Sequence, residues 1–181
     1  RYRYYSDTNS YSSIQTLTQG ASFGSNISYI DDLFVISEPT GSPNVYIYQL
    51  ITTTLSNTLD LYQTIAAPVG VTTWGTSTAL SGDQNWLYIS DIDNNYVYVY
   101  RKSALTDLYE YSTRITVAGL VSGDTFGYSI ATDYYGDTVV VGTPYKDYDV
   151  NTANYGYTYV FSRTVQNTIT RTSNQPFIPV V

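Results

Sequence analysis

The sequence repeats itself with a period of about fifty residues. Three blocks begin with a bulky aromatic residue followed by glycine, at Phe23-Gly24, Trp74-Gly75 and Phe126-Gly127, so that these glycines lie 51 and 52 residues apart. Self-similarity at a fixed period is the signature of a protein built from one unit used several times, because a single unit of this size cannot bury its own hydrophobic face. The repeat therefore predicts a series of similar structural units.

Each block predicts the same four β-strands. A short run of small and polar residues is followed by a turn with Asp or Gly, an apolar strand, a loop, and a third strand in which β-branched and aromatic residues alternate. That alternation, as in Val45-Tyr46-Ile47-Tyr48, indicates a strand covered on both faces, whereas the more polar fourth strand is typical of an outer edge. The expected strands are 25–29, 33–36, 45–48 and 60–65, then 76–80, 86–89, 97–100 and 109–115, then 128–132, 138–141, 158–161 and 168–173.

The N-terminus follows the same pattern out of phase. Residues 1–6 resemble a third strand and residues 12–17 a fourth, because Ile14-Gln15-Thr16-Leu17 matches Tyr62-Gln63-Thr64-Ile65. No segment shows a competing helical periodicity, and roughly fourteen strands are expected in all. The predicted fold class is all-β, with half a repeat followed by three whole ones.

Four-stranded units of about 50 residues arranged around an axis are the blades of β-propellers. The third block carries Phe126-Gly127, then Gly142-Thr143-Pro144, then a strand that ends at Phe161. This order resembles the FG-GAP repeat, the blade type of integrin α-subunit heads and of many bacterial and viral surface proteins. The first block keeps Phe23-Gly24 but has Ser37-Glu38-Pro39 at the second motif, and the second block is the most divergent.

The resemblance covers nearly the whole chain and implies a β-propeller segment of about three and a half four-stranded blades. By analogy with the family, the complete ring would have about seven blades. Because an open series of blades exposes two edges, we expect the chain to be part of a larger propeller, or of a ring that another chain completes. The expected divisions are a half blade at 1–20, blades at 21–72, 73–124 and 125–175, and a trailing segment at 176–181.

Composition excludes several classes of protein. The chain has no His, Cys or Met, so it cannot form a Ser-His-Asp triad, a zinc finger or a disulfide. Its 15 acidic and 8 basic residues give a net charge of −7, which argues against nucleic acid as a partner. No apolar run approaches the ~18 residues of a membrane-spanning helix, so no membrane span is expected in this segment.

The resemblance to FG-GAP blades makes calcium a possible ligand, because some of these blades bind it through Asp-rich turns between their first two strands. The matching turns in this chain have too few carboxylates. The loops between the second and third strands are richer, with Asp91 and Asp93 in the second block and Asp147 and Asp149 in the third. These four residues are the metal candidates; we expect no cofactor, with calcium at these loops as the alternative.

We expect no catalytic site. A glycosidase needs two carboxylates at a defined separation, but the only glutamates, Glu38 and Glu110, fall in different blocks. The turn Ser81-Gly82-Asp83 before Trp86 is superficially similar to the Asp box of sialidase propellers, but the tryptophan comes too early.

Tyrosine is the most unusual component, with 22 residues. The tyrosines of the third strands are expected to pack between blades. Tyr145, Tyr148 and Tyr155 lie instead in a loop that contains an insertion, because the third strands are 52 residues apart between the first two blocks and 61 between the next two. Loops often carry function, and tyrosine combines a flat apolar face with a polar tip, so these three are the candidate binding residues.

Together these features predict a non-enzymatic structural or adhesive module of a larger surface protein, which presents loops to a protein or a glycan. Because charged residues are few and Tyr, Thr and Asn are abundant, we expect an extracellular location, on a virion (capsid or tail fibre) or on a bacterial cell surface. The other expected partners are the blades or chains that complete the propeller. Two alternatives are a calcium-dependent, integrin-like ligand-binding domain and a carbohydrate-active propeller enzyme.

Overall fold

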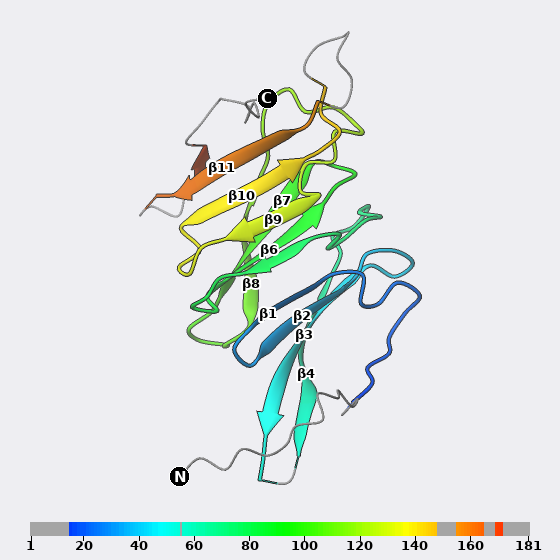
Figure 1. The fold of residues 1–181 in the computed structure, drawn as a ribbon, viewed down its shortest axis with the longest axis vertical. Coiled ribbons are helices and arrows are strands. Elements are labelled where there is room, and N and C mark those ends of the chain that lie inside the picture. Colours follow the sequence, from blue (N-terminus) through cyan, green and yellow to red (C-terminus); the bar gives the residue numbers. More distant parts are fainter. Residues whose placement is uncertain (1–14, 55, 148–154, 165–168, 172–181) are drawn as a thin grey trace, which may run out of the picture.

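The computed structural model describes residues 15–54, 56–147, 155–164 and 169–171. Every regular element in these ranges is a β-strand, which confirms the all-β prediction. This part of the chain therefore has no helix that could cross a membrane. The strands form three antiparallel sheets of four strands each, one after another along the chain (Figure 1).

Each sheet is a meander in which every strand pairs with the next one in sequence. The first sheet contains β1 (Ile27–Ile30), β2 (Leu33–Glu38), β3 (Asn44–Thr52) and β4 (Asn57–Ala66). The second contains β5 (Thr78–Leu80), β6 (Trp86–Asp91), β7 (Tyr96–Lys102) and β8 (Tyr109–Ile115). The third contains β9 (Ser129–Thr132), β10 (Thr138–Thr143), β11 (Tyr157–Arg163) and β12 (Ile169–Arg171).

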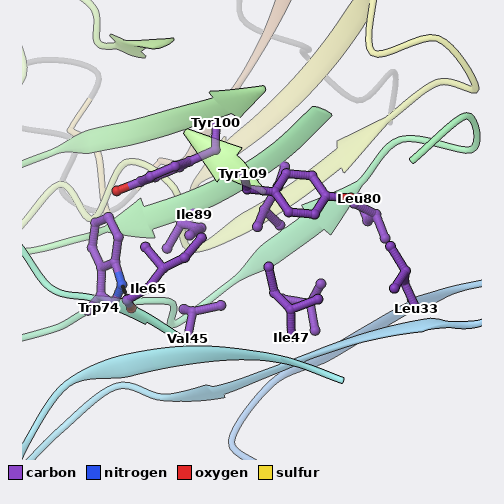
Figure 2. Packing of buried hydrophobic residues seen from close by; sticks show 11 residues of the cluster. Leu33, Val45, Ile47, Ile65, Trp74, Leu80, Ile89, Tyr100 and Tyr109 are labelled. Carbon is purple, nitrogen blue, oxygen red and sulfur yellow. Dashed lines mark hydrogen bonds between the residues drawn. The ribbon is translucent and has the colours of Figure 1, made fainter. Parts of the chain in front are cut away.

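The hydrophobic core lies between successive sheets, in two clusters. The first cluster joins the first and second sheets; Figure 2 shows Val45 and Ile47 pointing from β3 toward side chains of the second sheet that include Ile89. In β7, Val97 belongs to the second cluster, whereas Tyr100 belongs to the first. The alternation seen in the sequence thus places β-branched residues toward the next sheet and aromatic residues toward the preceding one.

The aromatic residue of each aromatic–glycine pair packs against the third strand of its own sheet. Trp74 and Phe126 are 0% exposed and each belongs to one of the two core clusters, whereas Phe23 is only partly buried. These rings therefore fill the wedge between neighbouring sheets, as large aromatic side chains do in interiors. The ring centroids lie 5.5 Å apart for Phe23 and Tyr46, 5.0 Å for Trp74 and Tyr98, and 5.9 Å for Phe126 and Tyr159.

Gly75 lies where the first and second sheets touch, a contact that we call the first joint. Its φ is +76°, a backbone conformation that favours glycine. A Cβ at Gly75 would lie 2.7 Å from Cγ2 of Val45 and 3.0 Å from Cβ of Ser37. Ser37 and Val45 are directly opposite each other across β2 and β3. The glycine therefore lets the second sheet sit against one cross-strand pair of the first.

Gly127 forms a second joint of the same kind between the second and third sheets. Its φ is +95°, and a Cβ there would lie 3.0 Å from Cβ of Ser90 and 3.2 Å from Cγ2 of Val97. Ser90 and Val97 are directly opposite each other across β6 and β7, at the positions that Ser37 and Val45 hold in the first sheet. The two joints are thus built from equivalent residues about fifty positions apart.

The first strands of the sheets are also linked by polar side chains. β1 lies beside β5, and β5 beside β9. Asn26 Oδ1 accepts a hydrogen bond from the backbone N–H of Thr78 at 2.9 Å and another from its hydroxyl at 2.7 Å. Ser77 Oγ accepts a hydrogen bond from the backbone N–H of Ile130 at 3.1 Å. Each link satisfies a backbone donor between two sheets.

The expected half repeat lies mostly outside the described residues, because residues 1–14 are not among them, and the same holds for the trailing segment 176–181. Residues 15–17 belong to no described strand. The side chain of Gln15 nevertheless bonds the main chain of Leu59, with Leu59 N–H donating to Oε1 at 2.7 Å and Nε2 donating to Leu59 O at 3.1 Å.

Candidate binding site at the end of the third sheet

A cavity of about 250 Å³ opens at the end of the third sheet where β9 begins and the β10–β11 loop leaves. Its floor contains Ser129 at the start of β9 and the cross-strand pair Gly142 and Thr158. Ser129 and Thr158 are exposed. Hydroxyl groups and main chain therefore supply polarity to the cavity, and none of the described residues that line it carries a charge. The lining is completed by Tyr128, Thr143, Pro144, Gly156 and Tyr157.

Two of the three predicted binding tyrosines lie near this cavity, and Tyr148 is outside the described residues. Tyr145 follows Pro144 of the cavity wall and is 47% exposed, and Tyr155 precedes Gly156 and is 46% exposed. The ring of Tyr145 packs edge-on against that of Tyr128, with the centroids 5.9 Å apart. Tyr128 lines the cavity, the Tyr145 ring contacts it, and Tyr155 adjoins the lining residue Gly156 in the chain; we call these three the rim tyrosines. They offer flat apolar surface near exposed hydroxyl groups.

The base of the β10–β11 loop is anchored by Lys146. Its Nζ donates to Gly119 O at 3.0 Å and lies 3.4 Å from Oδ2 of Asp124, and it sits 5.8 Å from the centroid of the Tyr157 ring. Asp124 is 2% exposed, and its Oδ2 also accepts the backbone N–H of Val121 at 2.9 Å. A buried carboxylate with these partners holds the loop base in place.

Asp91 and Asp93 are engaged by neighbouring side chains in the β6–β7 loop. Asp91 is 0% exposed, and its oxygens accept hydrogen bonds from Nδ2 of Asn94 at 3.1 and 3.0 Å. Burial raises the pKa of Asp91. Asp93 Oδ2 accepts the hydroxyl of Thr72 at 2.6 Å. Both carboxylates therefore tie the loop to its surroundings.

Asp147 is exposed at the edge of the β10–β11 loop, and Asp149 lies outside the described residues. Among the residues that the structure describes, no three acidic side chains form a group that could hold a metal ion. The geometry therefore brings Asp91, at the end of β6, and Asp93 close together in the chain, without a third acidic side chain among the described residues.

The residues considered for catalysis have structural contacts as well. Glu38 is 3% exposed at the end of β2 and accepts the hydroxyl of Tyr46 at 3.0 Å, and Glu110 lies in β8 of another sheet. In the turn that resembles an Asp box, Asp83 accepts the hydroxyl of Ser81 at 2.6 Å and so closes the turn on itself.

A larger cleft of about 670 Å³ runs along β7 and β8. The Trp86 ring centroid lies 5.5 Å from the Arg101 guanidinium and 4.3 Å from that of Arg163, and Trp86 is 4% exposed. Both Arg163 and Lys102 form ion pairs with aspartates. The aromatic ring and two of the cations of this cleft are therefore already engaged within the chain.

The sequence pattern did not indicate three exposed tyrosines that the structure shows. Tyr128, 47% exposed, falls in an expected first strand, outside the inserted loop that contains the predicted binding tyrosines. Tyr134 and Tyr135 are both 61% exposed in the β9–β10 turn, with ring centroids 4.9 Å apart. Two adjacent tyrosines in a turn with Asp and Gly could have indicated this second exposed aromatic surface, because such turns lie at the protein surface.

No family model matches the chain, and no curated protein matches it. Its function is therefore inferred from the contacts within the chain.

Proposed function

We propose that this chain is a non-enzymatic segment of a β-propeller with FG-GAP-like blades, and that it works as a structural and binding module of a larger protein on a virion or a cell surface. The third sheet presents its tyrosine-rimmed cavity to another protein or to a glycan. The blades hold the loops in place, and the loops carry the ligand contacts.

The propeller is supported by the way in which the sheets follow one another. Each is a four-stranded meander, neighbouring sheets bury a core between their faces, and the first strands β1, β5 and β9 lie next to one another in order. Propeller blades have this arrangement because their first strands surround the central axis. The two glycine joints are also built from equivalent residues, so the first and second sheets pack together in the same way as the second and third.

The observation that carries the binding role is the exposure of Tyr128, Tyr145 and Tyr155 beside a cavity with exposed hydroxyl groups. Tyrosines of the third strands are needed for the core, as Tyr48 and Tyr159 show by being 3% and 4% exposed. The rim tyrosines are instead about half exposed and belong to neither core cluster. Exposed aromatic side chains beside polar groups are typical of surfaces that bind proteins and sugars.

The test is a binding screen of the labelled chain against an array of glycans and an array of extracellular proteins. The double variant Tyr145→Ala/Tyr155→Ala should lose at least about tenfold in affinity for whatever the unmodified chain binds. The matched control is Tyr134→Ala/Tyr135→Ala, which removes two exposed tyrosines from the other end of β9. Absence of binding on both arrays, or equal binding by the two double variants, would contradict the proposal.

A further inference from the structure

The cavity of the third sheet occupies the position of a third joint. In the first and second joints, a glycine of the following sheet sits against a cross-strand pair between the second and third strands. The equivalent pair in the third sheet is Gly142 and Thr158, which are directly opposite each other across β10 and β11. Both residues line the cavity. The cavity is therefore the place where the next glycine would sit.

Burial distinguishes the filled joints from the open one. Val45 and Val97, which form half of the pairs in the first and second joints, are 0% exposed because the following sheet covers them. Thr158 holds the same position in the third sheet and is exposed. The hydroxyl group of each pair has also changed strand: it belongs to the second strand in Ser37 and Ser90 but to the third strand in Thr158.

The polar link between first strands is prepared in the same way. In the filled joints, Asn26 and Ser77 each accept the backbone N–H of a residue in the next first strand, Thr78 and Ile130. Ser129 is the equivalent residue of the third sheet, because it lies opposite Gly142 in the register of β9 and β10. Its exposed side chain lines the cavity, so it can accept the corresponding N–H of an incoming strand.

The sequence shows which segment would fit. It has only three pairs of Phe or Trp followed by Gly, and those at Trp74 and Phe126 already occupy the first and second joints. The pair at Phe23 in a second copy is the less suited occupant, because Gln15 ahead of it already bonds the main chain of Leu59. That contact matches the one between Gln63 of β4 and Tyr109 of the following sheet. Gln15 therefore occupies, beside the first sheet, the position that the outer strand of a preceding sheet would take.

We infer that the end of the third sheet is a docking joint for a polypeptide segment of the same repeat class, through an aromatic–glycine pair followed by a first strand. Its glycine would sit against Gly142 and Thr158, and an N–H of its strand would bond Ser129. This inference names the partner class for the site of the proposed function, and it rests on that site being a binding surface. The occupant supplies the apolar face that covers the third sheet.

The test uses a fluorescent peptide with the sequence of residues 116–132, which contains Phe126-Gly127 and β9, titrated with the unmodified chain. Fluorescence anisotropy should show saturable binding. Thr158→Arg places a long charged side chain in the joint at an exposed position and should weaken binding at least about tenfold. The matched control Ser112→Arg changes an exposed position of β8 and should bind like the unmodified chain.

Two further arms separate the possible failures. A peptide with Phe126→Ala lacks the ring that fills the wedge and should also bind at least about tenfold more weakly. Absence of peptide binding to the unmodified chain, or equal binding by Thr158→Arg, would overturn the docking joint. The Tyr145→Ala/Tyr155→Ala variant keeps the joint and should still bind the peptide, so a loss of glycan or protein binding in that variant concerns the rim tyrosines alone.

Discussion

Gln63 of the first sheet pairs with the main chain of Tyr109 in the second: its Nε2 donates to Tyr109 O at 2.9 Å, and its Oε1 accepts from Tyr109 N–H at 2.8 Å. Gln15 makes the same two-bond contact with Leu59, which holds in β4 the place that Tyr109 holds in β8. A side-chain amide thus contacts the main chain of an outer strand in the same way at two places in the chain. The second contact falls in the segment that the sequence pattern predicts as half a repeat.

Replacing Gln63 with Ala should lower the free energy of unfolding by about 1–3 kcal/mol, because two hydrogen bonds to a main chain are lost. Urea unfolding followed by tyrosine and tryptophan fluorescence measures the change. Thr64→Ala, at an exposed neighbouring position of β4, is the control and should change stability much less. Equal effects of the two substitutions would mean that the amide contact does not hold the sheets together.

Asn26 combines a structural contact with a glycosylation sequon, Asn26-Ile27-Ser28. Because Oδ1 of Asn26 accepts two hydrogen bonds from Thr78, Asn26→Ala should destabilise the chain by about 1–3 kcal/mol. Thermal unfolding of material made without glycosylation measures this directly. Ser28→Ala also removes the sequon but only one hydroxyl contact with Thr78, and it should cost less. A larger loss of stability for Ser28→Ala than for Asn26→Ala would contradict the structural role given to the Asn26 side chain.

The hydrogen bonds of Asp32 predict that the folded chain loses stability at acidic pH. Its carboxylate accepts hydrogen bonds from Gln49 and, across the first joint, from Gln84, and these bonds hold its pKa below the usual value. A carboxyl whose pKa is lower in the folded chain stabilises the fold above its unfolded pKa of about 3.8, and this stabilisation is lost as the pH falls through the folded value.

Asp32→Asn should therefore be less stable than the unmodified chain at pH 6, and the difference should shrink as the pH is lowered toward 2.5. Urea midpoints at both pH values measure it. If the urea midpoints of the variant and the unmodified chain differ by the same amount at both pH values, the charge of Asp32 makes no net contribution to stability.

The burial of Tyr100 predicts that the folded chain loses stability at alkaline pH. It is 8% exposed, and burial raises its pKa to about 12. A tyrosine with a raised folded pKa favours the fold while it is neutral, so stability declines as the pH rises above the ordinary value near 10. Tyr100→Phe should lose less stability than the unmodified chain between pH 9 and pH 11.5. An equal or greater loss of stability for Tyr100→Phe over this pH range would contradict the burial argument.

Much of the fold could be predicted because the repeat is local in each block. The alternation in Val97-Tyr98-Val99-Tyr100 indicates a strand covered on both faces, and β7 has this character. The contacts of Gln63 and Asn26 could not be predicted, because their partners lie 46 and 52 residues away and are set by how the sheets stack. A single polar residue in a strand carries no sign of such a distant acceptor or donor.

The candidate site was predicted in part. Tyr145 and Tyr155 could be singled out because the inserted loop lies outside the repeat, and both are exposed. Tyr128 could not, since it follows Gly127 in an expected first strand rather than lying in the inserted loop. Its exposure reflects the uncovered end of the third sheet, which is a property of the stack rather than of the local sequence.

The account depends most on the glycine joints, and Gly24 supplies an internal reference for them. Gly24 and Gly75 both have positive φ, at +89° and +76°, so an alanine at either position bears a similar backbone cost of about 1–2 kcal/mol. They differ in their surroundings: no described atom lies within 4 Å of a Cβ at Gly24, whereas a Cβ at Gly75 would overlap Val45.

The free energies of urea unfolding of Gly24→Ala and Gly75→Ala, compared side by side, therefore test the central claim most directly. If successive sheets are held at glycine joints, Gly75→Ala should lose about 1–3 kcal/mol more than Gly24→Ala, because the added methyl group overpacks the contact between two sheets. Equal losses in the two variants would contradict the claim and would leave the aromatic–glycine repeat as a feature of the turn alone.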